Sequence, residues 1–372
     1  MQKVIHLVLG KANPNRMNGV SKVVHYHALY LHKLGEDVEI WGLTKSPKDP
    51  VIERDITTRL FRSQPFFRGL DPSLMMAIEW LKGDVIFHIH GALIPDFYLV
   101  TNILIEKKIP YVYTPHGAFN EVALRKNRML KKLYILGFEK KMLRNARMVQ
   151  FLGKSEYDNI SKILTLKNKI IIPNGQSFEE LNYVYHYIQH RKFPVFGFCG
   201  RLDNYYKGLD LLINAFASYA MSNGTGELWL IGNGPDRQKL EQQVIAHNLS
   251  SRIRFFGAKY GAEKYNLIAN MDVFVHPSHS EGSPTAVLEA AALGLPLLVT
   301  TGTNVGSMVD EYKCGMHIPD NSVETIAAAL NAFDVIFKDG GLNEMKEASL
   351  KMVKAEFDWT KVAVRLKEIY TA

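Results

Sequence analysis

The chain has 372 residues, more than one hydrophobic core usually supports, so we expect two domains of ordinary size. Apolar residues make up 47% of the sequence and charged residues 22%, which excludes a largely disordered protein. The formal net charge is +8, and the two cysteines, Cys199 and Cys314, are too few for a disulfide framework and are expected to be reduced and buried.

The chain starts with a strand-like run at residues 4–9, without the basic segment, apolar stretch or cleavage site of a signal peptide. No run approaches the ~18 apolar residues that a membrane-spanning helix requires. These features predict a cytoplasmic protein.

Short apolar, β-branched runs alternate with stretches of helical period in both halves of the chain. The predicted strands of the first half are residues 4–9, 37–43, 84–90, 111–114, 148–152 and 170–172. The predicted strands of the second half are residues 195–200, 228–232, 253–257, 273–276 and 296–300. Strands that alternate with helices predict parallel sheets wound by right-handed crossovers.

Residues 184–194 are polar and aromatic without a clear period, and we place the linker between two domains there. The predicted N-terminal domain spans residues 1–183, and the predicted C-terminal domain spans residues 195–356. A last amphipathic helix, residues 357–372, is expected to pack back on the N-terminal domain. The prediction is an α/β fold with two Rossmann-like domains facing a central cleft, with ligands at the carboxyl ends of the strands.

A strongly basic segment lies between Glu121 and Arg147, where nine basic and two acidic residues give a local net charge of 9 − 2 = +7. Interleaved apolar residues predict a basic amphipathic helix that could lie on an anionic membrane surface. The lysines that would contact the membrane are Lys131, Lys132, Lys140 and Lys141. The alternative is a solvated helix whose apolar side packs on its own domain. No motif of a nucleic-acid-binding module accompanies the segment, so no nucleic-acid partner is expected.

Residues 280–290 follow the predicted strand 273–276 and form the first candidate binding segment. Ser283 is a good N-cap and Pro284 suits the first helical position, so a helix that includes Thr285 is predicted to begin here. The unpaired N–H groups and the dipole of a helix N-terminus suit a diphosphate.

Two acids, Glu281 and Glu289, flank this helix start and can accept hydrogen bonds from hydroxyl groups. An ordinary capped helix with two unrelated acids is the alternative for this segment alone. A second segment favours the diphosphate site over this alternative, because Arg201 and Lys207 follow the end of the predicted strand 195–200. Two cations at a strand end can offset the charge that develops on a departing diphosphate.

Three histidines of the first half are candidates for polar contacts at the cleft. His88 and His90 lie on one face of the predicted strand 84–90 and could suggest a metal pair. No third ligand is spaced nearby in the sequence, so we favour packing and polar contacts and expect no metal. His116 follows the predicted strand 111–114, which places its ring at the mouth of the cleft, although a turn residue bonded to the backbone is the alternative.

Taken in order, these motifs resemble those of the family 4 glycosyltransferases, and the resemblance spans most of the chain. The motifs of the second half are Gly200-Arg201-Leu202 with Lys207-Gly208, Ile231-Gly232-Asn233-Gly234-Pro235, Phe255-Phe256-Gly257, His276-Pro277-Ser278, and Glu281-Gly282 with Glu289-Ala290. The motifs of the first half are Asn18-Gly19, residues 84–91, Thr114-Pro115-His116-Gly117 and Ile172-Pro173-Asn174-Gly175. The resemblance implies a GT-B fold.

The resemblance also implies roles for individual residues. Arg201 and Lys207 match the pair that contacts the donor diphosphate. Glu281 matches the residue near the hydroxyls of the donor sugar, and Glu289 matches the residue that holds the ribose. His116 matches the histidine beside the reacting centre.

Two further parts of the donor site are implied. Gly19 matches the second glycine of a loop that touches the diphosphate, but Asn18 stands where the family usually has another glycine. The base is expected near Phe256 and Lys259.

The implied activity is the transfer of a sugar, with retention of configuration, from a nucleotide-diphosphate sugar to a hydroxyl of a growing glycan. A UDP-sugar is favoured on family frequency. No cofactor or metal is expected, because Arg201 and Lys207 can replace a metal and the chain has no Asp-x-Asp triplet. Glu281 and His116 would orient the sugar rather than attack it.

Residues 114–146 resemble those of members that build bacterial surface polysaccharides such as O-antigens and capsules. The implied acceptor is a lipid-linked saccharide, and the protein would then lie peripherally on the inner face of the cytoplasmic membrane. A GT-B-fold sugar-nucleotide epimerase, a phosphorylase and a non-catalytic sugar-nucleotide or polysaccharide-binding protein are the alternatives. A nicotinamide dehydrogenase is poorly supported, because residues 232–237 lack the last glycine of the dinucleotide fingerprint.

Overall fold

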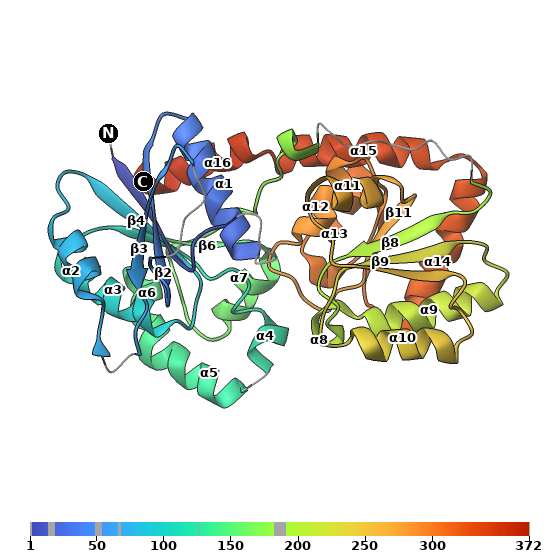
Figure 1. Ribbon diagram of the computed structural model, residues 1–372, viewed down its shortest axis with the longest axis horizontal. Helices are drawn as coiled ribbons and strands as arrows, with labels where there is room; N and C mark the ends of the chain where they lie inside the picture. Colours follow the sequence, from blue (N-terminus) through green and yellow to red (C-terminus); the bar gives the residue numbers. More distant parts are fainter. Residues whose placement is uncertain are drawn as a thin grey trace. The chain divides into compact units, whose positions relative to one another are not determined.

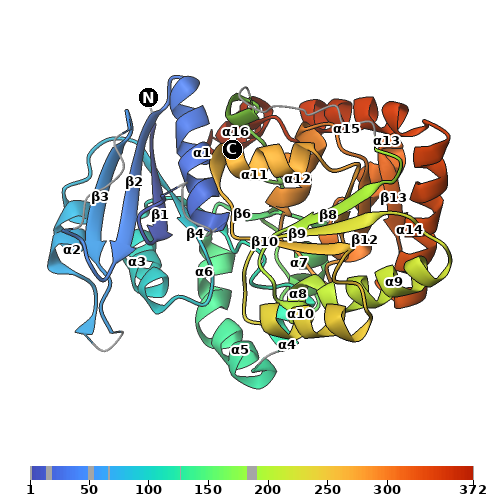
Figure 2. The ribbon, with the colours of Figure 1, turned by 45° about the vertical axis from the view of Figure 1, so that its right-hand side comes forward.

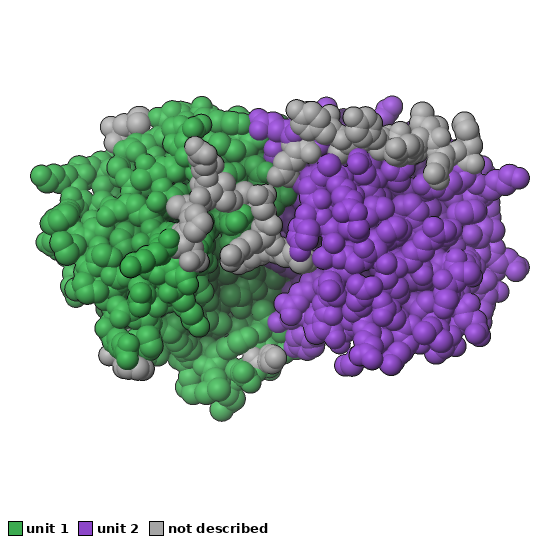
Figure 3. Space-filling model, in the orientation of Figure 1, with its two compact units in different colours: residues 1–175, 359–372 green, residues 176–358 purple. Residues whose placement is uncertain are grey.

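A computed structural model describes residues 2–13, 19–48, 54–65, 68–125, 127–181 and 191–371. The chain divides into two compact units, one of residues 1–175 with 359–372 and one of residues 176–358 (Figure 3). Most of the linker predicted at residues 184–194 lies outside the described residues. No helix in the described part of the chain is both long enough and apolar enough to cross a membrane.

The first unit contains a seven-stranded sheet in which all neighbouring strands are parallel (Figure 1). The strands are β1 (Lys3–Leu9), β2 (Asp37–Thr44), β3 (Thr57–Arg62), β4 (Val85–His90), β5 (Tyr111–Thr114), β6 (Met148–Phe151) and β7 (Lys169–Ile171). Their order is β3-β2-β1-β4-β5-β6-β7, so the direction of winding reverses between β1 and β4. Ligands of such sheets bind beyond the carboxyl ends of the strands at this switch point.

Helices cover the first sheet. They are α1 (Gly19–Lys33), α2 (Pro72–Glu79), α3 (Pro95–Glu106), α4 (Glu121–Arg125), α5 (Arg128–Tyr134), α6 (Lys140–Asn145), α7 (Lys154–Ser161) and α16 (Trp359–Thr371). The C-terminal helix α16 packs against α1, where the rings of Trp359 and Tyr26 stack with centroids 5.6 Å apart. It begins at Trp359 rather than at the predicted residue 357, because Phe357 ends the preceding helix.

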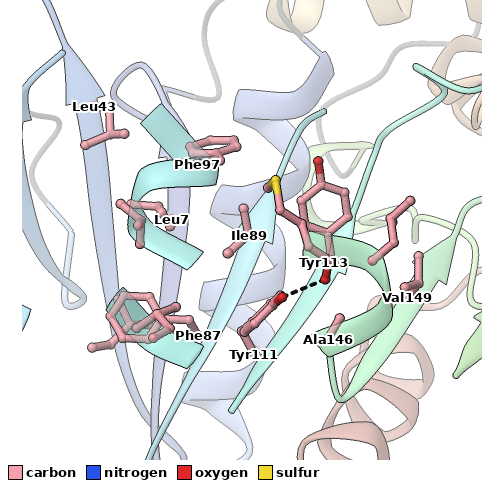
Figure 4. Packing of buried hydrophobic residues seen from close by; sticks show 14 of the residues in the cluster. Leu7, Leu43, Phe87, Ile89, Phe97, Tyr111, Tyr113, Ala146 and Val149 are labelled. Carbon is pink, nitrogen blue, oxygen red and sulfur yellow. Dashed lines mark hydrogen bonds between the residues drawn. The ribbon is translucent and has the colours of Figure 1, made fainter. Parts of the chain in front are cut away.

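The apolar core of the first unit explains why its strands read as continuous apolar runs. Every residue of β4 is buried, as expected for a central strand that is covered on both faces. Figure 4 shows Phe87 and Ile89 of this strand among the side chains of one core cluster. The one polar end of Tyr111 is satisfied, because its hydroxyl donates to the Met142 carbonyl at 2.6 Å.

The second unit repeats the plan with six parallel strands (Figure 2). The strands are β8 (Val195–Cys199), β9 (Glu227–Ile231), β10 (Ile253–Gly257), β11 (Val273–His276), β12 (Leu297–Thr300) and β13 (Gly315–Ile318). Their order is β10-β9-β8-β11-β12-β13, so the switch point lies between β8 and β11. The helices are α8 (Asn204–Lys207), α9 (Leu209–Met221), α10 (Arg237–Ala246), α11 (Gly261–Ala269), α12 (Thr285–Ala292), α13 (Gly306–Tyr312), α14 (Val323–Lys338) and α15 (Leu342–Glu356).

The basic segment is not the single helix that its period predicts. A π-helix at Ile135–Glu139 interrupts it between α5 and α6. The carboxylate of Glu139 holds this turn, because its Oε1 accepts from the Leu93 N–H at 2.6 Å and its Oε2 from the Tyr113 hydroxyl at 2.7 Å. Burial raises the pKa of Glu139 to about 7 despite these two hydrogen bonds.

Candidate active site

Two loops meet at the switch point of the second sheet. One follows β8 and contains α8, and the other joins β11 to α12. Gly208 allows them to touch, since its φ is +62° and an added Cβ would lie 2.6 Å from the Pro277 carbonyl oxygen. The His279 N–H donates to the Tyr206 carbonyl at 2.9 Å, which fixes the contact.

The contact brings Lys207 and Glu281 together in an ion pair, although 73 residues separate them in the sequence. Glu281 Oε1 also lies 2.8 Å from His276 Nε2 and accepts a hydrogen bond from the Ser278 hydroxyl at 2.9 Å. The carboxylate is 13% exposed and His276 is 2% exposed. Lys207 and Glu281, which the sequence assigns to different parts of the donor, are therefore members of one largely buried cluster of four side chains.

The charges in this cluster follow from its geometry. Burial opposes ionisation of Glu281, but Lys207 and His276 outweigh it and hold the pKa of the carboxyl far below its usual range. Burial lowers the pKa of His276 despite the neighbouring carboxylate. His276 is therefore neutral at neutral pH, and its Nε2–H donates to Glu281, because an ionised carboxylate only accepts.

The loop after β12 holds Glu281 from the other side. The Glu281 N–H donates to the Gly302 carbonyl at 2.8 Å, and the Asn304 side-chain amide donates to the Glu281 carbonyl at 2.6 Å. A Cβ at Gly302 would lie 2.5 Å from the Ser278 carbonyl oxygen, so only glycine allows this close packing. The loop after β12 thus fixes the backbone of Glu281, and the other two loops fix its carboxylate.

The start of α12 differs from the prediction. Its first residue is Thr285, Pro284 occupies the cap position, and no side chain caps the helix. The prediction that Ser283 is the N-cap and Pro284 the first helical residue is wrong. The reason is that the N–H groups of Val287 and Leu288 both bond to the Pro284 carbonyl, which moves the first turn along by one residue.

The second acid of α12, Glu289, is 5% exposed and has a partner that the sequence motifs do not indicate. Lys264 Nζ of α11 lies 2.8 Å from each of its two carboxylate oxygens. The hydroxyl of Tyr265 lies 3.4 Å from Oε1. The pair depends on the packing of α11 against α12. No short sequence motif contains both Lys264 and Glu289, so the sequence does not predict it.

The other predicted donor residues lie at the same edge of the second sheet. Arg201 directly follows the turn after β8, is 66% exposed and has its Nε 3.8 Å from Asp203. Phe256 belongs to β10, and Lys259 lies just after this strand in an ion pair with Glu263. The structure places Arg201 beside the Lys207 loop, and it places the two residues predicted to lie near the base two strands away from β8.

In the first unit, Gly19 is the exposed first residue of α1, and Asn18 lies outside the described residues. His116 follows β5 with a φ of +54°, and its Nε2 lies 3.0 Å from His90 Nδ1. Burial lowers the pKa of His116. His116 is therefore a turn residue, as the alternative has it, and its side chain bonds to His90 rather than to the backbone.

His88 and His90 make the expected packing and polar contacts. His88 Nδ1 lies 2.7 Å from the Tyr370 hydroxyl, and His90 Nε2 lies 2.8 Å from His6 Nδ1. The sequence spacing predicts that no third histidine lies near His88 and His90. The structure shows that this prediction is wrong. The sheet and α1 bring His6 and His27 to the same place, since these residues are far from β4 only along the chain.

The basic segment exposes its apolar side chains at α5. No residue of α5 is buried, and Met129, Leu130 and Leu133 are 77%, 68% and 64% exposed. In α6, by contrast, Met142 and Leu143 are buried in the core of the first unit. The alternative in which the apolar side packs on its own domain is therefore correct for α6 and wrong for α5.

Comparisons with known proteins agree with this fold. Residues 17–179 match the family described as Glycosyltransferase Family 4, and residues 188–336 match the family described as Glycosyl transferases group 1. The sucrose-phosphate synthase of Thermosynechococcus elongatus superposes with a TM-score of 0.82 at 20% identity, over 99% of this chain and 98% of that chain. The two parallel sheets thus form the GT-B fold.

The chain belongs to the family 4 glycosyltransferases. It is 28% identical over 175 residues to a glycogen synthase of Mycobacterium tuberculosis, a match that covers 47% of this chain and 42% of the relative. It is 29% identical over 139 residues to WcaL of Salmonella typhimurium, a glycosyltransferase assigned to colanic acid biosynthesis, over 36% of this chain and 34% of the relative. These matches span less than half the length of either relative.

Proposed function

We propose that this protein is a retaining, metal-independent glycosyltransferase that moves a hexosyl or N-acetylhexosaminyl group from a nucleotide-diphosphate sugar, with a UDP-sugar favoured, to a hydroxyl of a growing glycan. The observation that carries the proposal is the cluster of Lys207, Glu281, His276 and Ser278 at the switch point of the second sheet. This is the position where open α/β sheets bind nucleotides.

The donor diphosphate binds against two cations and one helix end. Lys207 supplies a point charge and Arg201 a planar fork, and both lie in the loop that follows β8. At the N-terminus of α12, Ser283 and Thr285 supply N–H groups, Pro284 between them turns the chain into the helix, and the positive end of the helix dipole faces the diphosphate. Gly19 of α1 is proposed as a further backbone contact of the diphosphate.

The two acids bind the two sugars of the donor. Glu281 accepts hydrogen bonds from the hydroxyls of the transferred sugar, since its carboxylate is ionised and held by Lys207, His276 and Ser278. Glu289 accepts from the ribose, and Lys264 Nζ, 2.8 Å from each of its carboxylate oxygens, pairs with this buried acid. The base lies near Phe256 and Lys259.

The chemical step needs no nucleophile from the protein. The acceptor oxygen attacks the anomeric carbon on the face from which the diphosphate leaves, the bond from that carbon to the diphosphate breaks, and the acceptor proton passes to the leaving phosphate oxygen. Lys207 and Arg201 stabilise the charge on the diphosphate, a role that a metal ion fills in other enzymes. His116 positions the reacting sugar.

The proposed acceptor is a lipid-linked saccharide of a bacterial surface polysaccharide such as an O-antigen or capsule. The assignment of WcaL to colanic acid biosynthesis supports this class of product. Three exposed apolar residues of α5, together with Lys131, Lys132, Lys140 and Lys141, support peripheral contact with an anionic membrane at its cytoplasmic face.

Product analysis tests the proposal. The full chain is incubated with nucleotide-diphosphate sugars and lipid-linked or free glycan acceptors, and the products are identified by mass spectrometry and by NMR of the anomeric proton. The expected result is a new glycoside with the anomeric configuration of the donor and one nucleoside diphosphate released per transfer. Epimerised sugar nucleotide, phosphate-dependent cleavage, or binding without turnover would each contradict it and point to the corresponding alternative function.

A further inference from the structure

We propose that His6, His27, His88 and His90 form a binding site for one divalent transition-metal ion inside the first unit. Each of the four residues offers a ring nitrogen, and these nitrogens all lie within 4.8 Å of one another. They come from β1, α1 and β4, and all four side chains are at most 1% exposed. No other such cluster of histidine, cysteine and carboxylate groups occurs in the described part of the chain.

The hydrogen bonding of the cluster indicates an occupant. His6 Nε2 and both ring nitrogens of His27 are buried without a hydrogen-bond partner. Buried polar groups are almost always paired, and each unpaired nitrogen costs free energy of folding. A metal ion that His6 and His27 coordinate would satisfy two of these three nitrogens at once.

The remaining two histidines are hydrogen-bonded at both ring nitrogens, and His90 Nε2 lies 2.8 Å from His6 Nδ1. Each of these two rings would exchange one contact for the ion and keep the other as an outer contact. His88 Nδ1 lies 2.7 Å from the Tyr370 hydroxyl, and its Nε2 lies 2.7 Å from Thr114 Oγ1. His90 Nδ1 lies 3.0 Å from His116 Nε2. A ligating histidine commonly donates its second N–H to such a partner, which fixes the tautomer and the orientation of the ring.

The ligand set selects the class of ion. Four imidazoles without a thiolate or carboxylate suit Zn²⁺, Co²⁺, Ni²⁺ or Cu²⁺ and do not suit Mg²⁺ or Ca²⁺, which require oxygen ligands. Metal-to-nitrogen bonds of about 2.0–2.1 Å require the rings to turn inward from their present spacing. His6 and His88 are direct neighbours on β1 and β4, and their ring centroids lie 5.4 Å apart.

The site is separate from the proposed diphosphate site, and it borders the proposed active site only at His116, whose Nε2 lies 3.0 Å from His90 Nδ1. It lies in the first unit, whereas Lys207 and Glu281 lie in the second. A bound ion would link β1, β4 and α1 and, through the hydroxyl of Tyr370, the C-terminal helix α16. We infer a structural role for the ion, and the metal independence proposed for sugar transfer is unaffected.

Cobalt binding to the full, tag-free chain tests this inference. The protein is dialysed against a chelator, then titrated with Co²⁺ while the visible absorption and Tm are recorded. The expected result is one equivalent of Co²⁺ with the intense visible bands of a tetrahedral nitrogen site, and a Tm higher by at least about 5 °C because the ion binds only the folded chain. Zn²⁺ should displace Co²⁺ and remove the bands.

Two variants separate the buried site from surface binding. His27→Phe keeps an aromatic ring beside Trp359 and should remove the cobalt bands and the metal-dependent rise in Tm. The exposed His247 on the surface of the second unit provides the matched control, and His247→Ala should leave both unchanged. Absence of the bands in the unchanged protein, or bands that persist in His27→Phe, would overturn the inference. If His27→Phe does not fold, the titration of the unchanged protein still decides.

Discussion

Glu281 is a buried carboxylate, and its Oε1 is shared by Lys207, His276 and Ser278. This arrangement positions the acid before any donor binds, which avoids reorganisation during the reaction. The cluster should also be sensitive to the loss of Lys207, which is its cation at neutral pH because His276 is neutral.

Replacement of that cation should mainly slow the chemical step. Lys207→Met is expected to lower kcat for sugar transfer by about 10²–10³-fold, because the diphosphate loses a stabilising charge as it leaves. Steady-state kinetics with the donor identified by product analysis provides the measurement. Lys351→Met, at an exposed lysine of α15, is the control. A kcat within about twofold of the unchanged enzyme would contradict the role of Lys207.

The ion pair of Glu289 and Lys264 should contribute to the free energy of unfolding. Lys264→Met leaves Glu289 charged and buried, and it should lower the free energy of unfolding by about 3 kcal/mol, the range seen when one partner of a buried pair is removed. Lys264→Met with Glu289→Leu should recover most of that loss. Additive effects of the two changes in a double-mutant cycle would show that the pair is not coupled.

Glu156 of α7 should give the first unit a pH-dependent stability. Burial raises its pKa to about 7, although the N–H groups of Phe119 and Gly117 oppose the shift. The folded form therefore favours the protonated carboxyl. Its contribution to stability is full below the ordinary pKa of 4.5 and is lost as the pH rises to about 7.

Glu156→Gln removes this dependence, because an amide does not ionise and still accepts the Phe119 N–H. Relative to the unchanged protein, its free energy of unfolding should rise by up to about 3 kcal/mol between pH 4.5 and pH 8. Tm values measured across this range provide the test, with the exposed Glu347→Gln as the control. A constant difference in Tm at all pH values would contradict the shifted pKa.

At the residue scale, the sequence predicts charged groups better than their partners. Arg201, Lys207 and Glu281 follow strand ends, so motif and position indicate them together. Lys264 was not predictable, because its contact with Glu289 depends on how two helices pack.

At the element scale, α5 combines exposed apolar side chains with a basic charge. Charge reversal at Lys131, Lys132, Lys140 and Lys141 should weaken binding to anionic liposomes by at least about tenfold, since each lysine near such a surface contributes about 1 kcal/mol. Co-sedimentation at low and high salt is the measurement. Leu130→Ser with Leu133→Ser should weaken the binding at both salt concentrations.

The same charge change elsewhere provides the control for this experiment. Reversal of four exposed lysines of the second unit should leave binding close to that of the unchanged protein; these are Lys239, Lys313, Lys351 and Lys354. Equal loss in both sets would indicate a response to net charge alone. Unchanged binding after reversal of the two lysines of α5 and the two of α6 would make the basic segment a solvated surface.

Strands that form apolar runs are predictable from the sequence. The eleven predicted strands are all present within one residue at either end, including the edge strands β7 and β10, because each is a run of mostly apolar residues. The edge strands β3 and β13 are not predicted, since most of their residues are partly exposed and form no such run. The π-helix is also missed, because it depends on the tertiary contacts of Glu139.

At the scale of the whole molecule, the order of motifs carries the family and the fold. One family model matches each half of the chain, and the two sheets have the same winding. The histidine cluster could not be predicted from spacing along the sequence. His6, His27 and the two histidines of β4 are separated along the chain, and the pairing of β1 with β4 and the packing of α1 on β1 bring them together.

Nucleotide binding tests the central claim most directly. Thermal shift of the full chain is measured with UDP, GDP, ADP and their sugars, because a ligand that binds only the folded state raises Tm. At least one nucleoside diphosphate, with UDP favoured, should raise Tm in the unchanged protein and lose most of this effect in Arg201→Ala with Lys207→Ala. No response to any nucleotide, or an equal response in the double variant, would contradict a diphosphate site at the switch point of the second sheet.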